Sequence, residues 1–224
     1  SDPRTYVEIG LTYADIGNVT RIVTKPEAST QYSAVRFGYA MNDRTVTHVV
    51  GETWDDASVC PPVNYQITWA REFRYDGARA RYLNRELSPA GLLMNPPQFN
   101  SLSDIWTDYD GDSAYGDFEV TPGYPPTVTN RRSYQPGLAQ VDPWMSSGGT
   151  ATDYVMSDHL GTTRGLIAPN NVPTDAAVYT AFGERISGTN HRFGYVGSWG
   201  YQAHDEMPFL HVGARYYDPA TGRF

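Results

Sequence analysis

Residues 11–23 read LTYADIGNVTRIV, and this stretch predicts a β-hairpin. Its centre, residues 15–18 (DIGN), suits a tight turn because Gly and Asn adopt positive φ more readily than other residues. In an extended strand, residues 19–24 place Val19 and Val23 on one face and Thr20 and Thr24 on the other. This unit of strand, turn and strand sets the pattern for the rest of the chain.

Three further segments repeat the unit, each with small polar residues between two strand-like runs. They are residues 36–50 (RFGYAMNDRTVTHVV), 73–87 (FRYDGARARYLNREL) and 107–120 (TDYDGDSAYGDFEV). A single hairpin is only marginally stable in water, so neighbouring hairpins must pair and bury a shared face. The repeats therefore predict a continuous array of hairpins.

The composition favours the same class of fold. The chain of 224 residues contains 17 Tyr, 21 Gly and 16 Pro, and only 19% of its residues are charged. Aromatic side chains suit pleated surfaces, whereas Gly and Pro punctuate strands with turns. We expect an all-β fold of consecutive antiparallel hairpins in one curved spiral sheet, forming a shell-like wall without long helices.

Charge and hydropathy exclude several classes of function. The formal net charge is -8 and Lys25 is the single lysine, which argues against a nucleic-acid partner because phosphate backbones are bound by clustered cations. No run approaches the roughly 18 apolar residues that a membrane span requires. The single cysteine, Cys60, has no partner for an internal disulfide or spacing for a metal site.

The C-terminal third carries four sequence blocks in a fixed order. They are residues 158–164 (DHLGTTR), 182–184 (FGE), 192–195 (RFGY) and 214–224 (ARYYDPATGRF). Together they resemble the RHS repeat-associated core, and the upstream hairpins resemble YD repeats. The resemblance points to the RHS/YD-repeat family, which includes toxin carriers, shell components of insecticidal toxin complexes and teneurins.

The resemblance implies a secreted or cell-surface shell that encloses or scaffolds something. We expect residues 1–152 to form degenerate YD-repeat hairpins with loop insertions and residues 153–224 to form the core, in one continuous structural unit. Expected partners are other copies of the chain or the rest of an RHS shell. A fragment of a polymorphic-toxin carrier, which encapsulates a C-terminal toxin, is the first alternative function.

The family's cleavage motif lies downstream of the core, and this chain stops at Phe224 before reaching it. We therefore expect no autoproteolysis and no other enzymatic activity, and no cofactor. The chain is also short for a complete shell. Because open sheet edges are templates for strand addition, self-assembly into a tube or filament is a hypothesis that follows from its length.

Architectural roles are implied for residues in the matched blocks. Asp158 and His159 are adjacent on the chain and point to opposite faces in a strand, which disfavours a catalytic dyad. Gly161 is expected in a turn and Arg164 in a buried polar contact, and Asp218 and Pro219 at the start of another turn. The full set of family-motif residues is Asp158, His159, Gly161, Arg164, Phe182, Gly183, Arg215, Tyr216, Tyr217, Asp218, Pro219 and Gly222.

One acidic segment matches part of a calcium-loop pattern. Asp108, Asp110, Asp112 and Glu119 occupy positions one, three, five and twelve of such a loop, where carboxylates gather around Ca²⁺. Ser113 stands at the sixth position, where the loop requires Gly. A YD-type hairpin turn explains the same residues, so calcium binding and a plain turn both remain open.

Aromatic side chains leave a second alternative function. The five tryptophans are Trp54, Trp69, Trp106, Trp144 and Trp199. Most are expected to fill the wall as cross-strand pairs, but an exposed ring can stack on a sugar. A glycan-binding surface adhesin is therefore the alternative from a different functional class.

Overall fold

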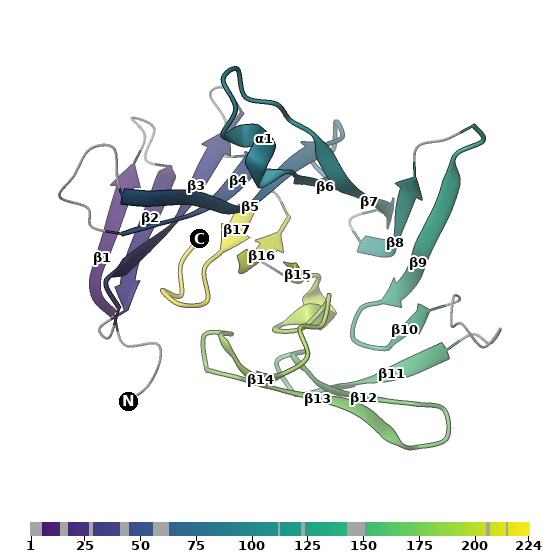
Figure 1. Ribbon diagram of the computed structural model, residues 1–224. Helices are drawn as coiled ribbons and strands as arrows, with labels where there is room; N and C mark the ends of the chain where they lie inside the picture. The colour runs from purple at the N-terminus through teal and green to yellow at the C-terminus, as the bar shows by residue number, and fades with distance from the viewer. Residues whose placement is uncertain are drawn as a thin grey trace. The chain divides into compact units, whose positions relative to one another are not determined.

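A computed structural model describes residues 6–13, 18–26, 29–40, 45–55, 63–111, 113–121, 124–142, 151–204, 207–213 and 215–224. Fourteen strands form one sheet in chain order, from β1 to β14, and each consecutive pair whose register is described is antiparallel. Three further strands form a separate small sheet in the order β15, β16, β17. Figure 1 shows the strands following one another along the chain.

The first eight strands are β1 (Tyr6–Tyr13), β2 (Val19–Pro26), β3 (Gln31–Tyr39), β4 (Val46–Asp55), β5 (Val63–Tyr75), β6 (Arg81–Leu87), β7 (Ser101–Asp110) and β8 (Ser113–Thr121). The remaining strands are β9 (Thr127–Gln135), β10 (Ala139–Asp142), β11 (Ala151–Ser157), β12 (Thr163–Ile167), β13 (Pro173–Tyr179), β14 (Arg185–Gly188), β15 (Gln202–His204), β16 (Met207–Val212) and β17 (Arg215–Tyr217). The helical elements of the described residues are α1 (Pro89–Leu92) and the 3-10 helix η1 (Gly197–Trp199).

This architecture confirms the predicted all-β class and its consecutive antiparallel hairpins. The hairpin read from residues 11–23 is formed by β1 and β2, with Leu11 opposite Ile22. The segment 36–50 lies in β3 and β4, and the segment 107–120 lies in β7 and β8. Residues 14–17, 41–44, Cys60 and Trp144 lie outside the described residues.

An aspartate closes the β5–β6 turn by a pattern that recurs later in the chain. The Asp76 side-chain oxygen Oδ1 accepts hydrogen bonds from the backbone N–H groups of Ala78 and Ala80, both at 2.9 Å. The backbone N–H of Asp76 also donates to the Ala80 carbonyl at 3.0 Å. Arg79 adopts φ of 67°, so the left-handed residue of this turn is Arg79 and not the neighbouring Gly77.

The chain divides into two compact units, residues 1–74 with 84–104, and residues 75–83 with 105–224. The predicted boundary between 152 and 153 falls within β11 and stays a prediction. In the first unit, Val50, Ala70 and Leu87 form a buried cluster against which Ile67 and Leu92 pack. In the second unit, the small sheet has its own buried cluster.

A buried glutamate lies on β4 in the first unit. Glu52 is 4% exposed and accepts a hydrogen bond from the Tyr65 hydroxyl at 3.0 Å. Its carboxylate also pairs with Arg36 Nε at 3.0 Å and Arg21 Nη2 at 3.2 Å. Because two guanidiniums and a hydroxyl surround this carboxylate, its burial is compensated.

Cross-strand aromatic pairs line both units, as the abundance of Tyr and Trp predicted. Tyr32 stacks on Trp54 with ring centroids 5.7 Å apart, and Tyr82 stacks on Trp106 at 5.8 Å. Tyr32 and Trp54 are directly opposite each other in the β3–β4 register. Such pairs add to the stability of neighbouring strands beyond the area that they bury.

A substitution at Gly51 can test how closely β4 packs against β5. It is buried and lies opposite Trp69, whose indole Nε1 would be 2.2 Å from a Cβ at position 51. We expect Gly51→Ala to lower the free energy of unfolding by about 1–3 kcal/mol, because the partly buried indole of Trp69 must move. Gly77→Ala is the control, since nothing lies within 4 Å of its Cβ position. Urea titration of both variants measures the difference, and equal losses would contradict this account of the packing.

Candidate functional site

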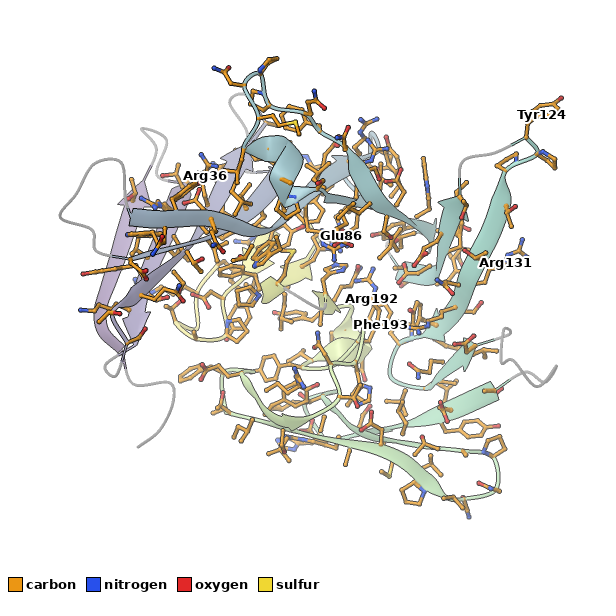
Figure 2. All side chains as sticks on the ribbon, in the orientation of Figure 1. Arg36, Glu86, Tyr124, Arg131, Arg192 and Phe193 are labelled. Atoms are coloured by element: carbon orange, nitrogen blue, oxygen red, sulfur yellow. The ribbon has the colours of Figure 1, made fainter. Side chains whose placement is uncertain are left out.

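The second unit contains a buried polar network around two arginines. Arg81 on β6 is 1% exposed. Arg192 precedes η1, and its side chain is 12% exposed (Figure 2). Burying a guanidinium is unfavourable unless acceptors replace its water, so the partners of these two side chains define the site.

Asp117 on β8 is the charged partner of Arg192. Arg192 Nε donates to Asp117 Oδ2 at 2.8 Å, and Thr107 Oγ1 donates to Asp117 Oδ1 at 2.6 Å. Burial alone raises the pKa of Asp117, but Arg192, Thr107 and Tyr134 outweigh it and hold that pKa below its usual range. The carboxylate is therefore ionised at neutral pH and compensates the charge of Arg192.

His204 on β15 lies between the two arginines. Its Nε2 atom is 3.0 Å from Arg192 Nη1 and is also in hydrogen-bond contact with Arg81 Nη2. Arg192 Nη1 additionally donates to the Ala203 carbonyl at 3.3 Å. Asn190 donates to the backbone carbonyl of His204 at 3.2 Å. His204 thus connects the small sheet to both guanidiniums.

Tyr216 on β17 completes the contact with Arg81. Arg81 Nη1 donates to the Tyr216 hydroxyl at 2.6 Å, and the Tyr75 hydroxyl lies 3.5 Å from that same oxygen. Burial, followed by the neighbouring Tyr216, raises the pKa of Tyr75 well above its ordinary range. Tyr109 on β7 donates to the Arg81 carbonyl at 3.2 Å. Tyr75 is therefore a neutral hydrogen-bonding group.

His211 on β16 is packed beside these tyrosines. It is 2% exposed, and its ring centroid lies 5.3 Å from that of Tyr216 and 6.3 Å from that of Tyr75. Among the described residues, neither ring nitrogen makes a hydrogen bond of normal geometry, and the Gly213 backbone favours protonation of the ring. Burial above all, and then the charges of Arg81 and nearby Arg192, hold the pKa of His211 well below its usual value.

The network joins segments that are distant in the chain. Its ion pair joins residues 75 positions apart, and the Arg81–Tyr216 bond joins residues 135 positions apart. The Thr107 hydroxyl is buried and donates to Asp117. The network fixes β15–β17 against the segment of β5–β9 that belongs to this unit.

Asp158 and Arg164 form the turn between β11 and β12. Asp158 Oδ1 accepts the backbone N–H groups of Leu160 at 2.9 Å and Thr162 at 3.0 Å, and Arg164 Nε donates to Oδ2 at 2.8 Å. Burial raises the pKa of Asp158, but these donors outweigh it and lower that pKa. The polar contact expected of Arg164 is present, but its side chain is 43% exposed and not buried, because β12 directs it outward.

His159 and Gly161 occupy the same turn, and His159 is exposed. Gly161 has φ of 76°, and a Cβ there would lie 2.9 Å from Trp199 Nε1. The Gly161 carbonyl accepts the N–H of Ser198 at 3.0 Å. Gly161 therefore permits both the turn and the close approach of η1.

Phe182 and Gly183 lie in the turn between β13 and β14. Gly183 has φ of 96°, and the ring of Tyr195 would be 2.4 Å from a Cβ at this position. Phe182 is 63% exposed, while its carbonyl accepts the Tyr217 hydroxyl at 2.9 Å. The backbone of this turn thus contacts the last strand of the chain.

The last block forms β17 and the turn that follows it. Tyr216 and Tyr217 are buried, whereas Arg215 is exposed and its Cζ lies 4.6 Å from the ring centroid of Phe224. Tyr217, Ala203 and Leu210 form the buried cluster of the small sheet.

Asp218 begins the final turn, followed by the buried Pro219. Asp218 Oδ1 accepts the Ala220 N–H at 2.9 Å, and its backbone carbonyl accepts the Gly222 N–H at 2.8 Å. Gly222 has φ of 68°, which favours a residue without a side chain. This turn uses an aspartate as the β5–β6 and β11–β12 turns do.

The four calcium candidates lie on the β7–β8 hairpin. Asp108 and Asp110 are exposed on β7, while the register places Glu119 opposite Ile105 and Asp108 opposite Gly116. Asp112 lies outside the described residues, among which no group of three or more potential metal ligands is found. Calcium binding by Asp108, Asp110, Asp112 and Glu119 stays a prediction.

Sequence reasoning did not identify most of the network. Arg192 stands in a quoted block, but Arg81, Asp117 and His204 carry no local motif. The available signal was weak: Asp117 is an acidic residue in the middle of a strand-like run, where a charge is unusual unless it is paired. Its partner is too distant in the chain for spacing to reveal.

Comparison with known proteins finds structural likeness at low identity. No protein-family model matches the sequence, and no curated protein matches it significantly. The crystal structure of TcdB2–TccC3 has a TM-score of 0.44 at 12% identity, covering 96% of this chain and 9% of that chain. The crystal structure of TcdB2–TccC3 without the hypervariable C-terminal region has a TM-score of 0.37 at 10% identity, covering 97% of this chain and 14% of that chain.

A Tc holotoxin pore from Photorhabdus luminescens gives a TM-score of 0.33 at 13% identity, covering 94% of this chain and 15% of that chain. The chain thus spans between 9% and 15% of these three structures' chains. Identities and TM-scores in this range do not establish a shared family or activity.

Asp117→Asn tests the importance of the buried ion pair. The substitution leaves Arg192 buried beside a neutral amide, so we expect the free energy of unfolding to fall by about 3–5 kcal/mol. Asp142→Asn is the control, because its pair with Arg132 is exposed on both sides at 3.6 Å and contributes little. Denaturant unfolding followed by circular dichroism measures both, and a loss at Asp117 no larger than at Asp142 would refute the assignment.

Proposed function

We propose that the chain is a structural wall segment of a secreted or cell-surface protein shell. The observation that supports this most is the chain-order array β1–β14, because consecutive hairpins extend a wall indefinitely without closing around one small site. The resemblance of residues 158–164 and 214–224 to the RHS core supports the same role. Among the described residues, no helix is both long and apolar enough to cross a bilayer.

The buried network supports a scaffolding role for the C-terminal segment. It connects β15–β17 to β6 through the Arg81–Tyr216 hydrogen bond and through His204, which contacts both Arg81 and Arg192. Arg192 in turn pairs with Asp117 on β8. A crevice beside Tyr134, His191 and Phe193 has room for about one water molecule, which is far below the size of a small-molecule site. These features suit a fixed wall better than a catalyst.

The proposed partners are other copies of the chain or the remainder of a shell. The array ends at β1 and at β14, and every residue of β14 is exposed. Unpaired backbone groups at such an edge can accept another strand. Assembly of copies through these edges would make the short chain a building block of a longer wall.

Edge pairing predicts association that depends on the β14 surface. We expect the purified chain to form oligomers or filaments, seen by electron microscopy and by mass in solution at increasing concentration. Ile186→Lys, on an exposed position of β14, should abolish association because charges on edge strands oppose pairing. Val172→Lys changes an equally exposed residue of the β12–β13 turn and should leave association intact.

Monomers at every concentration would overturn self-assembly. They would favour the toxin-carrier alternative, in which strands of one polypeptide continue the wall. Association that survives Ile186→Lys but fails with Val172→Lys would place the contact away from the β14 edge.

Glycan binding is the second candidate, and the exposure of Trp199 favours it. This indole is 77% exposed, whereas Trp54 is buried and Trp106 is stacked on Tyr82. If the chain is an adhesin, Trp199→Ala should remove its signals on a glycan array. Tyr124→Ala, at an exposed loop tip elsewhere in the same unit (Figure 2), should not. An array without signals for the unaltered chain would contradict glycan binding.

A further inference from the structure

An uncharged loop links β6 to β7 in the first unit. We call residues 88–102 the apolar loop; it includes α1 and the first two residues of β7. Its sequence, SPAGLLMNPPQFNSL, contains no charged side chain, although 19% of the whole chain is charged. Every residue from 93 to 102 is exposed. Figure 1 shows the backbone of this loop running out past α1 at the top of the view.

Large apolar side chains are concentrated on this loop. Leu93 is 53% exposed, Met94 50%, Phe99 68% and Leu102 60%. Among the described residues of the first unit, these four are the exposed large apolar side chains. Single exposed apolar residues are ordinary on protein surfaces, whereas a group of them marks a surface that binds a partner or a membrane.

Hydrogen bonds between its two limbs give the apolar loop its shape. The Ser88 N–H donates to the Asn100 carbonyl at 2.8 Å. The Gly91 carbonyl accepts the N–H groups of Gln98 at 2.8 Å and of Met94 at 3.2 Å. A Cβ at Gly91 would lie 2.5 Å from the Gln98 carbonyl oxygen, so the limbs are in contact here. The apolar side chains are therefore presented by a preformed backbone, and binding requires little further ordering.

The backbone of the loop has few free N–H groups to remove from water. Pro89, Pro96 and Pro97 have no N–H, and the N–H groups of Met94 and Gln98 already donate within the loop. Unpaired backbone groups are what normally exclude irregular segments from lipid. The side-chain amides and hydroxyls of the loop suit polar headgroups. This composition fits shallow insertion, with the backbone at the level of the headgroups.

The charges next to the loop are compensated by arginines. Asp104, which follows the loop, pairs with Arg85 Nη2 at 2.8 Å, and Glu86, which precedes it, lies 3.9 Å from Arg71 Nη2. The chain as a whole has a formal net charge of -8, which opposes binding to anionic lipids. Attraction to a bilayer must therefore come from the apolar side chains.

A protein partner fits this loop less well than a lipid surface does. Protein interfaces surround an apolar centre with a polar rim, are enriched in Arg, and match the shape of the partner closely. The apolar loop projects outward and contributes no charge to such a rim. Fluid acyl chains need no matching shape and no charged contact. The observations therefore favour lipid.

We propose that the apolar loop inserts into the surface of an uncharged lipid bilayer and attaches the chain to it. Leu93, Met94, Phe99 and Leu102 enter the acyl region, while the hydrogen-bonded backbone stays among the headgroups. The loop attaches to one face of the bilayer and does not span it. This inference goes beyond the wall function and does not depend on it.

Flotation of the whole chain with vesicles of phosphatidylcholine alone tests the attachment. We expect the chain to float with the vesicles equally well in low and high salt, because screening does not affect an apolar contact. Leu93→Asp and Phe99→Asp should each weaken partitioning by about tenfold or more, since an apolar side chain leaves the lipid and a charge must be dehydrated. Leu138→Asp is the matched control. Leu138 is 55% exposed, as Leu93 is 53% exposed, but it lies between β9 and β10 and should leave binding unchanged.

Methionine methyl signals measure insertion in the unaltered chain by nuclear magnetic resonance. The chain has 5 Met. Met94 lies on the apolar loop, whereas Met156 is 38% exposed and lies on β11 in the other unit. In phosphatidylcholine bicelles that carry a spin label on the acyl chain, we expect the Met94 methyl signal to broaden and that of Met156 to stay sharp.

Failure of the unaltered chain to float with phosphatidylcholine vesicles would overturn the proposal. So would binding that requires phosphatidylserine and disappears in high salt, because charge would then be its cause. If Leu93→Asp instead abolishes association of the chain with itself in lipid-free solution, the loop is a protein contact and the proposal is wrong. Ile186→Lys, which alters the β14 edge, should float as the unaltered chain does. The Met94 measurement needs no substitution, so a variant that fails to fold does not leave the question open.

Discussion

The ion pair between Asp117 and Arg192 is the interaction on which the C-terminal part of the structure depends. Neither charge is tolerable in a buried position without the other, so the strand that supplies Asp117 and the segment that supplies Arg192 must meet. Thr107 satisfies the remaining carboxylate oxygen. Arg81 then extends the network to Tyr216, and His204 joins the two guanidiniums. One electrostatic requirement thereby fixes three distant segments.

The turns of the sheet depend on a different and local device. Asp76 and Asp158 each use one side-chain oxygen to accept two backbone N–H groups two and four residues ahead. Asp218 accepts the N–H two residues ahead in the same manner. These bonds close each turn without help from a neighbouring hairpin. Local closure allows hairpins to be added one after another, which is what the chain-order sheet requires.

The contrast between local turn bonds and a long-range buried network explains how much of the structure could be predicted from sequence. The hairpins at 11–23, 36–50 and 107–120 were predictable because alternation and turn residues are local signals. The docking network was not, since Arg81 and Tyr216 are 135 positions apart. Acidic residues of β7 and β8 show what local sequence cannot predict. Asp108 is exposed and Asp117 is buried, and the strand register, with its bulge, determines which carboxylate faces the interior.

A polar network is a particular way to attach one sheet to another. An apolar contact of similar size would be at least as stable, because buried charges lose their hydration. Polar contacts instead demand one geometry: the lone pair of His204 accepts both guanidiniums only where they converge. The small sheet meanwhile retains its own apolar cluster around Leu210 and Tyr217. Orientation is therefore set by the network and internal stability by the cluster, so the attachment can be strict in geometry and still separable from the folding of the sheet that it holds.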